Sequence, residues 1–258
     1  MSKHSDGAEK KYRRDAEKGD PVAQFYLGHA YYLDAEETND YAEALTWIRK
    51  AAAQDYGIAL AHLGSMYKSG SGVPLDLAES KSWFRKAAEQ GHPHDQHTYA
   101  VMCWNGEFGT HDAKEAEVWW LKAAEQGMPE AHMALGDFYS DSFLTRPTRK
   151  DCIKGYMWHT LAALQDKPGH PPETSRTARD RIAEDMTPEQ VTEAENRVQL
   201  WLEEHSDVMG EDLVTHWRER VADPLKPLTP EEDAEAMARI EALLESIKKN
   251  QAGPDSDS

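Results

Sequence analysis

The sequence predicts an all-α fold: a right-handed α-α superhelix, or solenoid, of about four to five helix pairs with helical caps. The first observation is a recurring segment. Its clearest copy is Trp83-Phe84-Arg85-Lys86-Ala87-Ala88, and further copies begin at Trp47, Trp119 and, more loosely, Trp158. These tryptophans follow one another after 36, 36 and 39 residues. A fixed period in this range is typical of stacked repeat arrays.

The second observation is a motif, Ala-x3-Leu-Gly-x2-Tyr, on the same 36-residue spacing. Its central pairs are Leu27-Gly28, Leu63-Gly64 and Leu135-Gly136, with Tyr99-Ala100 in the third unit, where Cys103 replaces the aromatic residue. Small residues at fixed helix positions allow a neighbouring helix to approach closely, and the large aromatic residue fills the gap between helices. Each unit is therefore expected to be a pair of short helices.

These units resemble Sel-1-like repeats, which are relatives of the tetratricopeptide repeat. The second unit matches best: Leu63-Gly64-x2-Tyr67-x2-Gly70-x-Gly72-Val73-x2-Asp76 is followed by Trp83-x2-Lys86-Ala87-Ala88-Glu89-Gln90-Gly91. The resemblance runs from about residue 20 to residue 165, and a terminal pair extends it to about residue 204. It implies an α-solenoid that serves as a protein-binding scaffold, without implying a particular partner.

Helix start signals divide the chain into elements. A cap helix is expected at 7–19, and Asp20-Pro21 then supplies an N-cap and a proline at the first helical position. Thr187-Pro188-Glu189-Gln190 forms a capping box at a later start. The helix pairs are expected at 21–33 with 40–53, 57–69 with 76–90, 93–104 with 112–126, 129–140 with 150–165, and 173–184 with 188–204. The predicted domains are a cap helix (1–19), the solenoid (20–204), and a helical cap with a disordered acidic end (205–258).

The last region carries two further expected helices. The first, at 212–221, places Leu213, Trp217 and Val221 on one apolar stripe. The second, at 230–249, is amphipathic and needs a partner surface, because a solitary helix of this length is marginal in water. We expect it to dock on the C-terminal end of the array as a cap. The alternatives are docking on another chain and occupation of the groove, which would make the tail autoinhibitory. Deletion after Leu228 distinguishes a cap from an autoinhibitory tail.

Composition limits the function classes. The 258 residues include 29 Lys and Arg and 47 Asp and Glu, a formal net charge of −18. This charge argues against nucleic acid and against anionic membrane surfaces as partners. It favours a basic protein partner, although acidic residues that only solvate outer helix faces give the same composition. The start lacks an apolar signal-peptide region and no long apolar run occurs, so a cytoplasmic protein is expected.

Candidate chemistry is sparse, and neither a cofactor nor a metal is predicted. His94 and His97 share a helix face and could ligate a metal, but exposed histidines on a binding face are the favoured interpretation. Cys103 and Cys152 lie in different units. Cysteine-rich members of the resembled family have two cysteines in each unit, so the disulfide framework that they use is not expected here. Cys103 is expected to be an inert buried thiol.

Analogy with tetratricopeptide-like arrays places the first helix of each pair on the concave surface. The residues expected to turn away from the core and bind a partner are Phe25, His29, Tyr32, Lys68, His94, His97, Val101, Trp104, Met133 and Asp137. Phe25, Tyr32 and Trp104 are the expected aromatic anchors. Filling of the gaps between neighbouring repeats is the alternative for the same rings.

The resulting function prediction is a non-enzymatic adaptor that holds a protein or peptide in its concave groove. A narrower version is a bacterial immunity or effector-adaptor protein that neutralises a basic partner. The alternative is a hydrolase of the β-lactamase-like kind proposed for cysteine-rich relatives, although no activated serine can be named. A metal-dependent assembly joined through His94 and His97 is a third class.

Overall fold

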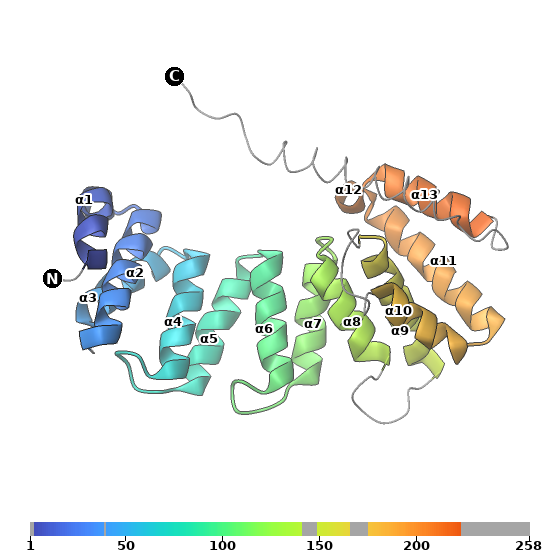
Figure 1. Cartoon of the computed structure of the whole chain (residues 1–258), viewed down its shortest axis with the longest axis horizontal. Coiled ribbons are helices and arrows are strands. Elements are labelled where there is room, and N and C mark those ends of the chain that lie inside the picture. The colour runs from blue at the N-terminus through green and yellow to red at the C-terminus, as the bar shows by residue number, and fades with distance from the viewer. Residues whose placement is uncertain (1–2, 39, 141–148, 166–174, 223–258) are drawn as a thin grey trace, which may run out of the picture. The chain divides into compact units, whose positions relative to one another are not determined.

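The computed structural model of the protein describes residues 3–38, 40–140, 149–165 and 175–222. Within these residues the chain forms thirteen helices and no strand. This confirms the predicted all-α class. The chain divides into two compact units, residues 1–123 and 124–258, each of which is described by itself (Figure 1).

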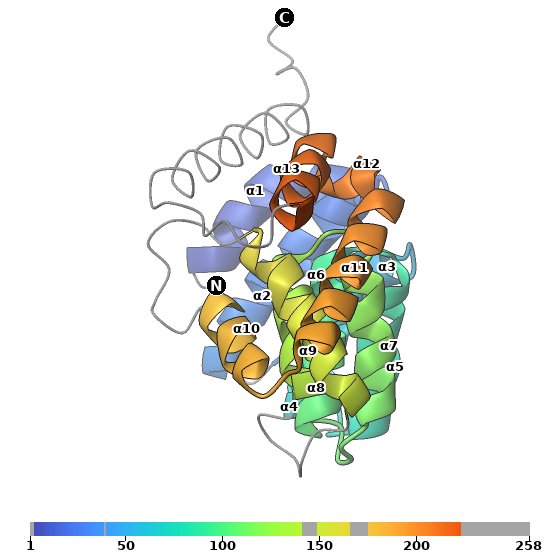
Figure 2. The same cartoon turned by 90° about the vertical axis from the view of Figure 1, so that its right-hand side faces the viewer.

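Unit 1 is a row of antiparallel helices. In chain order they are α1 (Lys3–Glu17), α2 (Pro21–Thr38), α3 (Ala42–Ala52), α4 (Gly57–Ser69), α5 (Leu77–Glu89), α6 (Pro93–Asn105) and α7 (Ala113–Ala124), the last ending one residue beyond the unit. Helix α2 packs on α3, and α4 packs on α5. In addition, α3 contacts α4 and α5 contacts α6. In the view of Figure 2, α3, α5 and α7 lie on one side of this row. In each repeat we call the first helix the A helix and the second the B helix. In unit 1 the A helices are α2, α4 and α6, and the B helices are α3, α5 and α7.

Aspartate side chains cap the N-termini of three of these helices. Asp20 accepts a hydrogen bond from the backbone N–H of Ala23 at 2.7 Å. Asp112 accepts one from the N–H of Glu115 at 3.1 Å. Asp76 accepts two, from residues 78 and 79, at 2.9 and 3.0 Å. These bonds satisfy N–H groups that have no partner within the helix. The predicted cap at Asp20 is thereby confirmed.

Replacing Asp76 by alanine is expected to lower the free energy of unfolding by about 1 kcal/mol, because α5 loses both capping bonds. Thermal and urea unfolding followed by circular dichroism measure the change. Asp76→Asn is the matched control, since an asparagine oxygen can accept the same bonds and should retain most of the stability. Equal stability of Asp76→Ala and the parent protein would contradict this account of the helix start.

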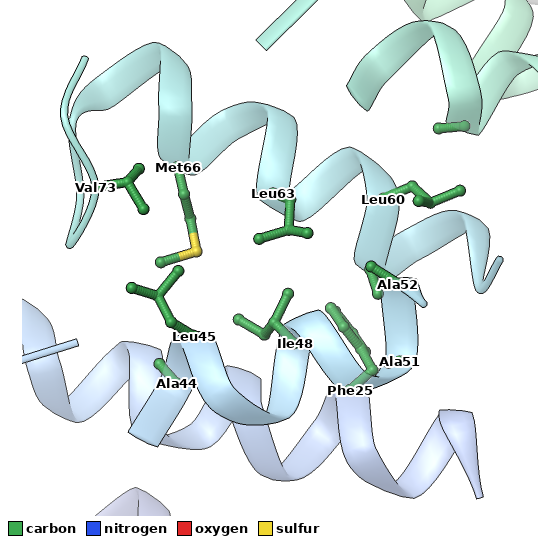
Figure 3. Packing of buried hydrophobic residues seen from close by; sticks show 12 residues of the cluster. Phe25, Ala44, Leu45, Ile48, Ala51, Ala52, Leu60, Leu63, Met66 and Val73 are labelled. Carbon is green, nitrogen blue, oxygen red and sulfur yellow. The ribbon is translucent and has the colours of Figure 1, made fainter. Parts of the chain in front are cut away.

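The core of unit 1 lies between successive helices and depends on close backbone approach. Figure 3 shows Ile48 of α3 facing Leu63 of α4, within a cluster that includes Leu45 and Met66. A Cβ atom built on Gly28 would lie 2.8 Å from Cγ1 of Ile48. The glycine of the repeated Leu-Gly pair is therefore required by the distance between the two helices of a repeat.

Helix α1 packs on α2 and forms the start of the row. Tyr12 stacks on Tyr26, with ring centroids 5.3 Å apart. Arg13 donates hydrogen bonds to Glu9 at 2.8 Å and to the hydroxyl of Tyr31 at 2.9 Å, and the Tyr31 hydroxyl also bonds to Glu9. The helix expected at 7–19 is therefore present, and it begins four residues earlier than expected.

A buried polar side chain joins successive helices at one position of the 36-residue spacing. Gln24 donates a hydrogen bond to the carbonyl of Ala16 at 3.0 Å. Gln96 makes the equivalent bond to Ala88 at 3.4 Å. In unit 2, Nε2 of His132 lies 3.2 Å from the carbonyl of Ala124. Each bond satisfies a carbonyl in the last turns of the preceding helix.

Unit 2 contains the remaining described helices. They are α8 (Pro129–Ser140), α9 (Arg149–Ala163), α10 (Ser175–Glu184), α11 (Pro188–Glu204), α12 (Ser206–Met209) and α13 (Glu211–Ala222). The capping box is confirmed, because the backbone N–H of Thr187 donates to Gln190 and that of Gln190 donates back to the Thr187 hydroxyl. Leu213 and Trp217 of α13 are buried, as the predicted stripe requires, and the side chain of its third member, Val221, lies outside the described residues. The helix expected at 230–249 lies outside the described residues.

Candidate functional site

Four rings from neighbouring repeats meet on the A helices of unit 1. Phe25, His29 and Tyr32 follow one face of α2 at helical spacing. His29 lies parallel to Phe25, with centroids 5.7 Å apart, and to Tyr32 at 6.4 Å. His62 of α4 lies nearly perpendicular to these rings, with centroids 5.8, 5.2 and 4.7 Å from those of Phe25, His29 and Tyr32. We call these four residues the ring cluster.

The two imidazoles of the ring cluster have unused hydrogen-bonding capacity. Burial, together with the nearby His29, lowers the pKa of His62 to about 4, so His62 is neutral at neutral pH. Among the described residues, Nδ1 of His29 and Nε2 of His62 are buried without a hydrogen-bond partner. A buried polar atom left in this state costs about 1–3 kcal/mol.

The helices that carry the ring cluster have few positive charges. Helix α2 contains three acidic residues, Asp34, Glu36 and Glu37, and no Lys or Arg. Helix α4 contains one basic residue, Lys68, which forms an ion pair with Glu107 in the connection between α6 and α7. Lys68 was expected on the partner-binding surface, and it is half-buried in this pair.

Phe25 does not turn away from the core as expected. Its side chain is 6% exposed. The ring centroid lies 5.7 Å from that of Tyr56, the residue before α4, and 5.8 Å from that of His62 in α4. The alternative prediction, that these rings fill the gaps between neighbouring repeats, is therefore correct for Phe25, because α4 approaches α2 closely enough to cover its ring. His29 and Tyr32 remain half-buried at the edge of the same cluster.

Sequence reasoning missed His62, the residue that joins the two helices. His62 stands 36 residues after Tyr26, and Tyr26 contacts the helix that precedes it, α1. Both side chains thus point toward the preceding element of the row. The place of His62 in the repeat, equivalent to that of Tyr26, could therefore have indicated that its side chain faces α2.

The third repeat holds the other expected residues of unit 1. His94 is exposed, whereas His97, Val101 and Trp104 are half-buried. The Trp104 ring lies 4.7 Å from that of His111 and 5.9 Å from that of Trp120. Trp104 therefore packs partly between helices and partly at the surface.

In unit 2, the expected residues Met133 and Asp137 are exposed on α8. Oδ1 of Asp137 lies 3.5 Å from Nε2 of His159, which is almost completely buried in α9. Burial lowers the pKa of His159 to about 4. The imidazole is therefore neutral at neutral pH, so its contact with Asp137 is not a strong ion pair.

Cys103 is fully buried and Cys152 is half-buried, and neither forms a disulfide. Burial raises the pKa of the Cys103 thiol to about 11. Its thiolate is consequently scarce at neutral pH, which agrees with the expected inert thiol. Within the described ranges, no group of three or more His, Cys, Asp or Glu side chains is placed to hold a metal ion. The helices described also include none with the length and apolar character needed to cross a membrane.

Comparison with known families decides what kind of array this is. A family model described as Sel1 repeat matches four successive segments, residues 21–56, 57–92, 94–128 and 129–167. The chain belongs to the Sel1 repeat family. The matched segments correspond to the A and B helix pairs α2–α3, α4–α5, α6–α7 and α8–α9. The Sel1 repeat family is, in general, one of protein-interaction scaffolds.

A solved structure of a bacterial protein shares the fold. A Sel1 repeat protein from Oxalobacter formigenes is 24% identical with a TM-score of 0.55, and the match covers 84% of this chain and 56% of that protein. The protective antigen c5321 of uropathogenic Escherichia coli, described as having an SLR fold, is 22% identical with a TM-score of 0.43. This match covers 84% of this chain and 51% of that protein. The chain therefore spans about half the length of these two proteins. A search of curated proteins gave no match.

Proposed function

We propose that this Sel1 repeat protein is a non-enzymatic scaffold in the cytoplasm that binds a partner protein or peptide along its A helices. The observation that carries the proposal is the match of four consecutive Sel1 repeats, since scaffolding is the general role of this family. Support at the residue level comes from the half-buried rings of His29, Tyr32 and His62 in the ring cluster. Aromatic residues at partly desolvated positions commonly dominate binding energy at interfaces.

The test is isolation of the partner with tagged full-length protein from the native cell, followed by measurement of affinity with purified components. Ser65 is exposed on α4 and holds the position that His29 holds in α2. We expect Ser65→Arg to weaken binding at least about tenfold, as a bulky charge in an interface does. Val118, exposed on the B helix α7, provides the control: Val118→Glu should bind normally. Equal binding by both variants would contradict use of the A helices.

The narrower form of the proposal is a bacterial immunity or effector-adaptor protein that neutralises a basic partner. It is supported by the net charge of −18, because complementary charge speeds association and suppresses wrong partners. An isolated partner with an acidic binding surface would contradict it. The alternative β-lactam hydrolase is tested separately with a chromogenic β-lactam, whose hydrolysis by the purified protein would overturn the non-enzymatic assignment.

A further inference from the structure

The first turns of α2 and α4 expose apolar side chains to solvent. Among the described residues of unit 1, five large apolar side chains are exposed, and three of them lie here: Val22 (43%), Tyr26 (42%) and Ile58 (51%). Val22 and Tyr26 are four residues apart, so they share one face of α2. Ile58 holds in α4 the repeat position that Val22 holds in α2. We call these three residues the apolar patch.

Aromatic rings connect the two helices of the apolar patch. The buried ring of Phe25 lies 5.5 Å from that of Tyr26 and 5.7 Å from that of Tyr56, measured between centroids. Tyr56 is half-buried and stands two residues before Ile58. Burial, together with the neighbouring Tyr26 and Asp20, raises the pKa of Tyr56. The exposed side chains of α2 and α4 therefore border one continuous run of rings.

An aspartate beside the apolar patch occupies a backbone position that suits glycine. Asp55 is exposed and has a positive φ of 56°. The same repeat position holds Gly19, Gly91 and Gly127, which also have positive φ. Within the described part of the chain, the Asp55 carboxylate has neither an ion-pair nor a hydrogen-bond partner. Aspartate here has a conformational cost that glycine avoids, and no described contact of its carboxylate offsets that cost.

The charges next to the apolar patch indicate which partner it suits. Near Tyr56 are the exposed carboxylates of Asp55 and Asp20, of which the second also caps α2. At the α1 edge, Lys11 lies over the ring of Tyr12, with Nζ 4.9 Å from the centroid. A cationic group is attracted to the carboxylates, whereas an anionic group is repelled by them. Charge therefore favours a partner segment with a basic residue on the α4 side.

We propose that the apolar patch docks an apolar segment of the partner protein that also carries a lysine or arginine, with the basic group next to Asp55. This inference rests on the proposed scaffold function. It specifies the part of the A helices that the partner contacts and the chemistry that the partner presents, neither of which the scaffold function alone requires.

The test begins without a known partner, because the probe is a displayed library of random peptides of about twelve residues. The library is selected on immobilised full-length protein at physiological salt, which screens general attraction of basic peptides to an acidic protein. We expect the enriched sequences to place a lysine or arginine next to apolar residues. Synthetic peptides with these sequences are then titrated against purified protein to measure their affinities.

Two variants locate the binding on the apolar patch. Ile58→Gln removes an apolar side chain without adding a charge, and it should weaken peptide binding at least about tenfold. Leu75→Gln is the matched control, because Leu75 is also exposed but lies in the connection between α4 and α5. It should bind as the parent protein does. Circular dichroism and melting curves establish that both variants are folded.

The role of Asp55 is tested by removing its charge in two ways. Asp55→Asn keeps the size of the side chain and its tolerance of positive φ, and it should weaken binding about fivefold, with the difference lost at high salt. Asp55→Gly should bind as weakly as Asp55→Asn, yet melt at the same temperature as the parent or higher. A purely structural role of Asp55 would leave peptide affinity unchanged in both variants.

Several results would overturn the proposal. The selection could enrich no peptide or only peptides without a basic residue, or Ile58→Gln could bind the enriched peptides as tightly as the parent does. Self-association of the parent that Ile58→Gln abolishes, measured by analytical ultracentrifugation, would assign the apolar patch to a second copy of the chain. Peptide affinity that rises on deletion after Leu228 would assign it to the chain's own tail.

The native partner separates this proposal from the scaffold function. A native partner that binds Ile58→Gln with unchanged affinity would overturn the docking site while leaving the scaffold function intact. Absence of any native partner would count against the scaffold function, whereas the peptide titrations would still decide whether the apolar patch binds a basic, apolar segment.

Discussion

Replacing Gly64 by alanine is expected to destabilise unit 1 by about 1–3 kcal/mol, the usual cost of overpacking a well-packed core. A Cβ atom on Gly64 would lie 2.6 Å from Cδ2 of Phe84 in α5, closer than real Cβ atoms approach. The aromatic ring or the whole helix α5 would have to move. Thermal and urea unfolding of the purified variant measure the loss.

The matched control is Gly57→Ala in the same helix. A Cβ atom on Gly57 would meet its nearest neighbour, Oδ2 of Asp95, at 3.6 Å, which is an ordinary contact. Alanine also favours helix over glycine by up to about 1 kcal/mol. The control should therefore be as stable as the parent or slightly more stable. If Gly64→Ala were equally stable, close approach of α4 and α5 would not be the reason for the repeated glycine.

Stability is expected to fall steeply as the pH is lowered from about 6.5 toward 4. Burial lowers the pKa of three histidines, His62 to about 4, His132 to about 3 and His159 to about 4. The same side chains take up a proton near pH 6.5 when the chain is unfolded. In this interval the unfolded chain binds more protons than the folded chain. Each histidine therefore lowers the free energy of unfolding by about 1.4 kcal/mol per pH unit.

The variant His132→Gln removes the contribution of one of these histidines to the pH dependence of stability. Glutamine already occupies the equivalent repeat positions, where Gln24 and Gln96 bond to the carbonyl eight residues earlier. The variant can therefore retain the bond to Ala124 that His132 makes, without the titrating ring. The slope of unfolding free energy against pH should decrease by about one proton. An unchanged slope would show that His132 does not stay neutral in the folded protein.

Much of the fold could be predicted from the sequence because the repeat period and the cap residues act locally. The expected helix 57–69 coincides with α4 (Gly57–Ser69), and Asp20 and Thr187 mark the starts of α2 and α11. The four-residue helix α12 was missed. A helix of this length contains too few residues to show a periodic pattern.

The candidate site was less predictable, because its contacts join different repeats. The position of a residue within one helix follows from the 3.6-residue period. Whether Phe25 faces solvent depends instead on how closely α4 approaches α2, which is set by packing over the whole interface. The same packing brings His62 against Phe25, His29 and Tyr32. The two unpartnered nitrogens are visible only once these rings are placed.

Photo-crosslinking in the native cell tests most directly the claim that the A helices bind the partner. A photoreactive residue is introduced at Ser65 on α4 or at Val118 on α7, both of which are exposed. We predict one dominant protein adduct from position 65, and no such adduct from position 118. An adduct of the same partner from position 118, with none from position 65, would contradict the account.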